Sequence, residues 1–143
     1  MTLYLDTALL IAAVVKEPTT PVVQKWLESN GAGGFATSRW ALTEASSALA
    51  LKVRTGDLTH EQRLATLMMF RSLVGTMELV AIQQADFEAA ASLMDRETVT
   101  LKSGDALHLA VATRLNMPLR TLDRRFVAGA KSTGCDVLVA TDQ

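Results

Sequence analysis

Four acidic residues have the types and positions that metal-dependent hydrolysis requires: Asp6, Glu44, Asp105 and Asp123. Carboxylate oxygens with few histidines nearby favour Mg²⁺ or Mn²⁺ over Zn²⁺, and a shell that the protein fills only in part leaves positions for water and phosphate oxygens. The chemistry that such a set supports is hydrolysis of a phosphodiester by a metal-activated water.

Each acid also has an ordinary structural explanation. Asp6 can cap the helix that follows it, and Asp105 can complement the positive end of a helix. Asp123 suits a turn after a strand. Glu44 lacks a basic partner three or four residues away and is compatible with an exposed helical glutamate. The argument for a site therefore depends on whether the four side chains converge.

The elements around the acids predict this convergence. Strand-favouring runs cover residues 3–5, 35–37, 77–82, 119–122 and 137–139. Helical patterns cover residues 8–15, 21–30, 39–54, 59–73, 84–95 and 103–115. Ser38 and Ser103 are expected as N-caps of two of these helices. Strands separated by helices predict an α/β fold, a three-layer α/β/α sandwich with a central, mainly parallel sheet.

In such a sheet Asp6 and Asp123 lie just beyond the carboxyl ends of their strands, where open parallel sheets bind ligands. Asp105, at the start of a helix, can face the same edge. Two carboxylates about 4 Å apart repel by roughly 4 kcal/mol at an effective dielectric of 20. A bound divalent cation is the simplest way to offset the repulsion among four carboxylates.

Composition limits the other functions. A chain of 143 residues, 49% apolar and 20% charged, fits a single domain over residues 1–143. The net charge of −1 supplies no general attraction to nucleic acid, so any RNA contact has to be local. The only cysteine, Cys135, excludes an internal disulfide and fits the cytoplasm. No apolar run reaches the roughly eighteen residues of a membrane span.

Four segments together resemble the successive acidic motifs of PIN-domain nucleases, specifically the VapC toxins of type II toxin-antitoxin pairs. They are LYLDT at 3–7, Thr43-Glu44, GDALHLA at 104–110 and LRTLDRRF at 119–126. The last two are the most specific, and the likeness extends over nearly the whole chain. The chain departs from the expected pattern at Ser103-Gly104, where small apolar residues are more typical.

The resemblance implies a PIN-like fold and a toxin that hydrolyses RNA with Mg²⁺, for which Mn²⁺ would substitute. Asp6 and Asp105 would bind the metal, Asp123 would bind it directly or through water, and Glu44 would orient a water or complete a second metal site. The partners implied are an RNA substrate, a cognate VapB-like antitoxin and a second copy of the chain in a homodimer, with no membrane.

Residues beside the acids supply further candidates. Thr7 and Thr121 either hydrogen-bond carboxylates or serve only as strand and turn residues. His108, three residues after Asp105, is a possible metal ligand or general acid, or a packed helix histidine. The apolar run at 64–70 fits a core, a homodimer interface or an antitoxin groove. Arg124 and Arg125 are the expected substrate-binding pair, within a wider basic set of Arg39, Lys102, Arg120, Arg124 and Arg125.

Other classes stay open from the sequence. A receiver-type phosphoacceptor domain is also α/β with acids at strand ends, but it needs a carboxylate pair after the first strand, where Thr7 follows Asp6. A catalytically silent binding module on a PIN-like scaffold is disfavoured because all four acids are present. Cleavage of DNA is a narrower rival, since attack by a metal-activated water does not need the 2′-hydroxyl of RNA.

Overall fold

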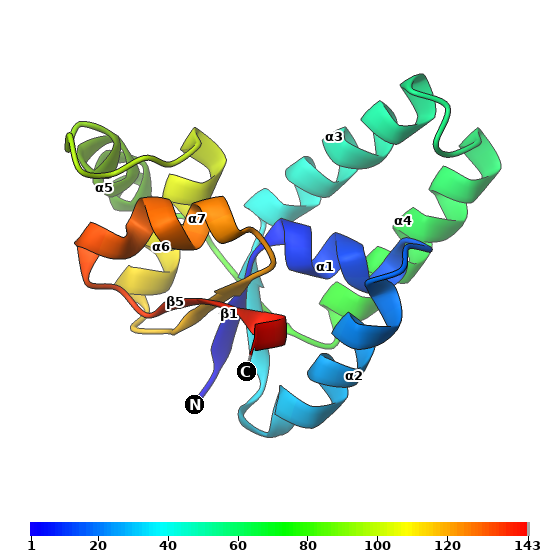
Figure 1. Cartoon of the computed structure of the whole chain (residues 1–143), viewed down its shortest axis with the longest axis horizontal. Helices are drawn as coiled ribbons and strands as arrows, with labels where there is room; N and C mark the ends of the chain where they lie inside the picture. The colour runs from blue at the N-terminus through cyan, green and yellow to red at the C-terminus, as the bar shows by residue number, and fades with distance from the viewer. Residues whose placement is uncertain (143) are drawn as a thin grey trace.

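A computed structural model describes residues 1–142. Within them, five short strands form one parallel sheet in the order β3-β2-β1-β4-β5 (Figure 1). The strands are β1 (Leu3–Leu5), β2 (Phe35–Ser38), β3 (Glu78–Val80), β4 (Leu119–Thr121) and β5 (Val137–Val139). This confirms the predicted parallel sheet and every strand expected from the sequence.

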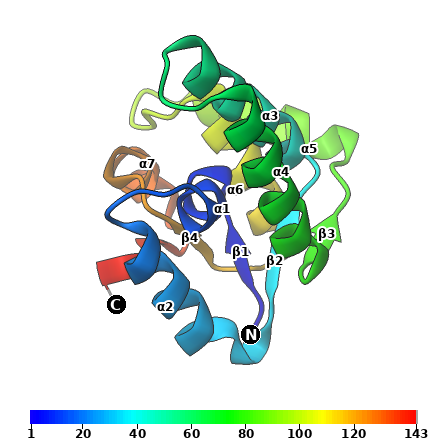
Figure 2. The same ribbon diagram turned by 90° about the vertical axis from the view of Figure 1, so that its right-hand side faces the viewer.

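Helices fill the connections and lie on both sides of the sheet (Figures 1 and 2). They are α1 (Thr7–Val14), α2 (Thr20–Asn30), α3 (Trp40–Arg54), α4 (His60–Gly75), α5 (Gln84–Met94), α6 (Ser103–Arg114) and α7 (Arg124–Ala130). Successive strand side chains point to opposite faces. Leu5 therefore packs in one core with α1 to α4, while Tyr4 packs in a second core with α6 and α7. The predicted α/β/α sandwich is confirmed.

The strand order reverses at the centre of the sheet. From β1 the chain adds β2 and then β3 on one side, and it returns across the sheet to add β4 and β5 on the other side. Loops that leave β1 and β4 in opposite directions open a crevice at the carboxyl ends of these strands, and α/β sheets bind their ligands there. Asp6 directly follows β1, and Asp123 lies two residues beyond β4.

Two predicted helix caps are wrong. Ser38 is the buried last residue of β2, and α3 begins after Arg39 without a side-chain cap. Ser103 is already inside α6, and Lys102 occupies the cap position without a side-chain hydrogen bond. A serine before an apolar helical run is compatible with either position. Pairing with neighbouring strands and burial against the core set the actual boundaries.

Helix α7 was not predicted from the sequence. Its seven residues are too few for a clear apolar period, and they include Gly129. Asp123 accepts hydrogen bonds from the backbone N–H groups of Arg125 and Phe126 and so begins the helix. Gly129 lets α7 pack directly on the backbone of Thr100, which donates its N–H to the Gly129 carbonyl at 3.2 Å. Tertiary contacts therefore stabilise this helix.

Helices α3 and α4 form a hairpin that projects away from the rest of the molecule (Figure 1). Thr59 and Gln62 begin α4 with reciprocal side-chain to backbone hydrogen bonds. Among residues 1–142, no helix combines the length and the apolar character that crossing a bilayer requires.

Candidate active site

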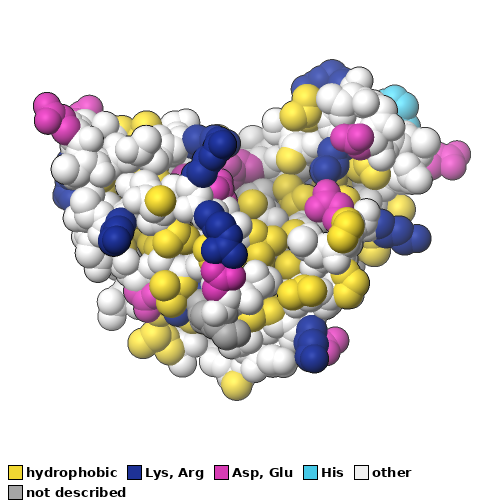
Figure 3. All heavy atoms as spheres, viewed as in Figure 1, with side chains coloured by type: hydrophobic (Ala, Val, Ile, Leu, Met, Phe, Trp, Pro, Cys, Tyr) yellow, Lys and Arg dark blue, Asp and Glu magenta, His cyan; other side chains and the backbone are white. Residues whose placement is uncertain are grey.

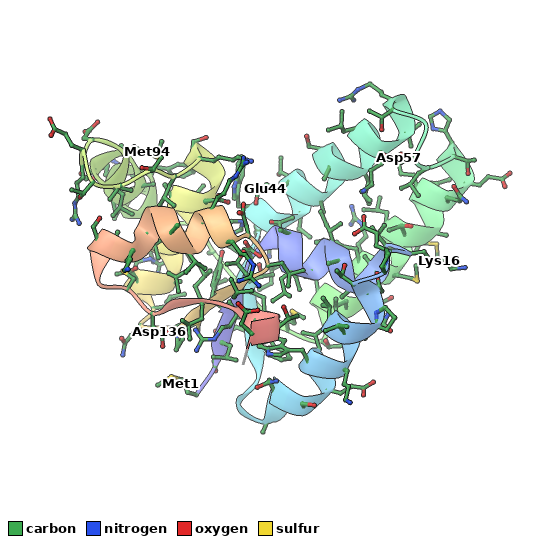
Figure 4. The ribbon with its side chains drawn as sticks, in the orientation of Figure 1. Met1, Lys16, Glu44, Asp57, Met94 and Asp136 are labelled. Atoms are coloured by element: carbon green, nitrogen blue, oxygen red, sulfur yellow. The ribbon has the colours of Figure 1, made fainter. Side chains whose placement is uncertain are left out.

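The fold brings the four predicted acids to the carboxyl edge of the sheet. The charge of Asp105 acts on Asp6, and the charges of Asp123 and Glu44 act on Asp105. In Figure 3 the surface is hollowed between the α3/α4 hairpin and the rest of the molecule, and acidic side chains lie beside basic ones there. Glu44 points into this region from the first turns of α3 (Figure 4).

Asp6 is the most deeply buried of the four, with 2% of its surface exposed. One carboxylate oxygen accepts the N–H of Leu9 at 3.1 Å and so caps α1. The other accepts the hydroxyl of Thr121 at 2.5 Å. Burial, with a smaller contribution from the charge of Asp105, raises the pKa of Asp6 to about 6 even though these hydrogen bonds favour the charged form.

Asp105 and Asp123 line a cavity of about 500 Å³ that is open to the surface. Burial raises the pKa of Asp105, and the charges of Asp123 and Glu44 add to this shift. Thr121 links Asp6 to Asp123 through hydrogen bonds. Its hydroxyl donates to the Asp6 carboxylate and accepts the backbone N–H of Asp123 at 3.0 Å. The threonine beside Asp123 therefore contacts two members of the acidic set.

Glu44 is bound across the site to residues that are distant in sequence. Its Oε1 contacts Nε2 of His108, and it accepts the Thr7 hydroxyl at 2.6 Å. Burial opposes the charge of Glu44, but the hydrogen bonds from His108 and Thr7 outweigh it and hold its pKa below the ordinary value. The sequence showed no partner because this one lies on another helix, 64 residues further along.

Gly104, where the chain departs from the expected motif, leaves space for Glu44. A Cβ atom at this position would lie 2.6 Å from Oε2 of Glu44 and 3.2 Å from the indole nitrogen of Trp40. Atoms that are not hydrogen-bonded do not approach so closely. The glycine therefore allows α3 and α6 to bring Glu44 close to Asp105.

The donor chemistry of this site fits Mg²⁺ or Mn²⁺, because it consists of carboxylate oxygens whose mutual repulsion a cation would relieve. As the side chains stand, no three Asp, Glu, His or Cys residues among 1–142 are arranged to hold one ion. Asp6, Asp123 and Glu44 each accept hydrogen bonds from the protein. A metal would have to compete with these bonds.

The five basic residues that were candidates for binding phosphate have different surroundings in the structure. Lys102 and Arg125 line the cavity beside Asp105 and Asp123. Two others are neutralised by acids elsewhere, since Arg120 is paired with Asp136 at 2.9 Å and Arg124 with Asp142 at 2.6 Å. Arg39 is exposed at the start of α3. Of the expected pair, only Arg125 lines the same cavity as the acids.

A family model described as PIN domain matches residues 3–138, which is most of the chain. The chain belongs to the PIN domain family. Among curated proteins it is similar to "Ribonuclease VapC47" of Mycobacterium tuberculosis (strain CDC 1551 / Oshkosh), with 26% identity over 137 residues and 92% of each chain covered. This membership removes the receiver-type alternative.

Two solved structures have the same fold at low sequence identity. VapC20 of Mycobacterium tuberculosis, described as a sarcin-ricin loop cleaving toxin, superposes with a TM-score of 0.67 at 17% identity over 93% of this chain and 95% of its own. VapBC2 of Rickettsia felis, bound to a DNA fragment from its promoter, gives 0.72 at 18% identity over 97% and 98%. At these identities the two matches describe the fold of this PIN domain.

The electrostatic cost of the site predicts a stability gain for Asp6→Asn. The pKa of an unfolded aspartate is about 3.9, whereas that of folded Asp6 is about 6. As pH rises between these values the unfolded chain releases its proton first, so the wild type loses stability. Asparagine keeps the helix cap and has no charge to bury. In urea unfolding with chelator, the stability of Asp6→Asn relative to the wild type should rise by about 2–3 kcal/mol between pH 4 and pH 7.

Asp95→Asn, at an exposed position after α5, is the control and should show no such pH-dependent gain. A loss of stability in Asp6→Asn that is the same at pH 4 and pH 7 would contradict the prediction.

Proposed function

We propose that this PIN-domain protein is the toxin of a type II toxin-antitoxin pair and acts in the cytoplasm as a Mg²⁺-dependent endoribonuclease. The observation that carries the proposal is the crowding of Asp6, Glu44, Asp105 and Asp123 at the strand-order reversal. The similarity to a curated ribonuclease supports RNA as the substrate. Toxin-antitoxin complexes among structures of this fold support an antitoxin partner.

In this proposal Asp6, Asp105 and Asp123 hold the metal, for which Mn²⁺ substitutes. When bound there, the metal would supply activation of a water for attack on an RNA phosphodiester and neutralisation of charge on the leaving oxygen. Glu44 orients the attacking water, and its hydrogen bonds to Thr7 and His108 keep it ionised for this role. Thr121 maintains the relative positions of Asp6 and Asp123.

Removing either central carboxylate should abolish cleavage without unfolding the protein. Asp6→Asn and Asp105→Asn should each lower the rate of RNA cleavage by at least about 100-fold, because charge on the reacting phosphate is no longer neutralised. The rate on a labelled RNA in Mg²⁺ or Mn²⁺ measures this, and calorimetric titration with Mn²⁺ measures metal binding independently. Full activity in both variants, with Asp95→Asn as control, would refute the site.

Arg125 and Arg124 are neighbours on α7 that should behave differently toward RNA. Arg125 lines the cavity with the acids, whereas Arg124 is already paired with Asp142 through both nitrogens. Arg125→Gln should reduce the slope of log affinity against log salt by about 0.7, the value for one phosphate contact on a single strand. Arg124→Gln should change the slope much less.

Fluorescence anisotropy with a labelled RNA in chelator, which prevents cleavage, measures both slopes. Equal effects of the two substitutions would mean that the cavity is not where the RNA strand lies.

The projecting hairpin carries apolar side chains that the monomer leaves exposed. Leu64 and Met68 are four residues apart and share one face of α4, and Met68 is 71% exposed. Leu51 of α3 and Met69 are also exposed, whereas Phe70 belongs to the core. We assign the stripe of Leu64 and Met68 to the interface of a homodimer. The antitoxin is proposed as a separate partner.

Met68→Glu should weaken that homodimer, because a buried charge without a partner opposes association. Sedimentation velocity should show a dimer for the wild type and a monomer for Met68→Glu. Met94→Glu is a matched control, since Met94 is an exposed methionine on α5 at 41% exposure. If Met68→Glu remains a dimer, the stripe is not the interface.

A further inference from the structure

A chain of buried hydrogen bonds connects the central strand β1 to Glu44. Tyr4 is fully buried, and its hydroxyl lies 2.6 Å from Nδ1 of His108. The two rings meet edge to face, with centroids 5.6 Å apart and planes at 62°. On the opposite side of the imidazole, Nε2 contacts Oε1 of Glu44. Tyr4 of β1, His108 of α6 and Glu44 of α3 are therefore connected in series.

His108 has no free ring nitrogen in this arrangement. Its exposure is 1%, and both nitrogens are engaged by protein oxygens. It is thus poorly placed to bind a metal or to protonate a leaving group, two roles that its position after Asp105 had suggested. Its contact with Glu44 nevertheless connects it directly to the acidic set.

Hydrogen-bonding rules determine what each group in the chain does. An ionised glutamate only accepts hydrogen bonds, so Nε2 of His108 must carry a hydrogen and donate it. A phenol hydroxyl can donate or accept, so Tyr4 satisfies Nδ1 whether the ring is neutral or charged. In both states the Nε2–H group points at Glu44.

We infer that Tyr4 is a positioning residue for Glu44 and that it acts through His108. Glu44 is held on both sides, because Oε1 accepts from His108 and Thr7 while Oε2 lies over Gly104. Its side chain is still 26% exposed and reaches the open part of the site. A glutamate fixed in this way presents one orientation to the reacting groups. The catalytic part of this inference rests on the proposed nuclease function, and the structural part does not.

Tyr4→Phe tests the structural part, because it removes one oxygen and preserves the packed ring. The chain has only two histidines, so His60→Gln assigns the imidazole signals in proton and nitrogen NMR spectra. The metal-free wild type should show an Nε2–H signal from His108 that is protected from exchange, and in Tyr4→Phe this hydrogen should exchange faster with solvent because Nδ1 no longer holds the ring. A signal that is unchanged in Tyr4→Phe would overturn the inference, whether or not the protein cleaves RNA.

A double-mutant cycle tests the catalytic part. Tyr4→Phe should lower kcat for RNA cleavage about 10-fold and leave KM unchanged, because Tyr4 touches no substrate group. His108→Gln keeps an N–H donor that can reach Glu44 but no longer depends on a hydroxyl at Nδ1. Because it removes the imidazole that keeps Glu44 ionised, His108→Gln should itself lower kcat, and adding Tyr4→Phe to it should have little further effect.

Thr66→Val is the matched control for a lost buried hydroxyl, since among residues 1–142 the Thr66 side chain bonds within α4, to the Gln62 carbonyl at 2.8 Å. Its kcat should equal that of the wild type. Equal losses of kcat from Tyr4→Phe in the wild-type and His108→Gln backgrounds would show that Tyr4 does not act through His108. A wild-type protein with the protected signal but no cleavage would refute the nuclease proposal alone.

Discussion

The central strands β1 and β4 lie side by side in parallel, with Leu5 opposite Arg120. Their hydrogen-bond ladder continues to the first acid, since the N–H of Asp6 donates to the Arg120 carbonyl at 3.3 Å. The next residue of β4, Thr121, donates to the Asp6 carboxylate and accepts the N–H of Asp123. This pairing brings together Asp6 and Asp123, which are 117 positions apart in the chain. It also forms the edge of the sheet beside which Asp105 lies.

The cost of this arrangement is electrostatic. Burial and neighbouring charges raise the pKa values of Asp6 and Asp105, so folding brings together carboxylates that are more easily ionised in the unfolded chain. Glu44 shows the opposite behaviour, because hydrogen bonds from His108 and Thr7 favour its charged form. The site therefore contains two carboxylates that a cation would stabilise and one that the protein stabilises itself.

Much of the fold could be predicted because local patterns and the parallel-sheet rule act together. Short apolar runs ending in Asp6 and Asp123 mark strands, and such strands in an α/β chain place their carboxyl ends at one edge. The failures share a physical cause. Helix α7 depends on the close approach of Gly129 to Thr100, a contact between distant segments. Ser38 has the side chain of a helix cap but is buried in β2.

The sequence by itself determined most of the strand and helix periodicity and singled out the four acids, because these depend on residue type and local spacing. Only the tertiary structure decided which side chains those groups contact. It pairs Arg124 with Asp142 and leaves Arg125 beside the acids, and it joins Glu44 to His108. These contacts depend on how α3, α6 and α7 pack around the sheet. Local sequence patterns do not predict contacts between helices that are distant in the chain.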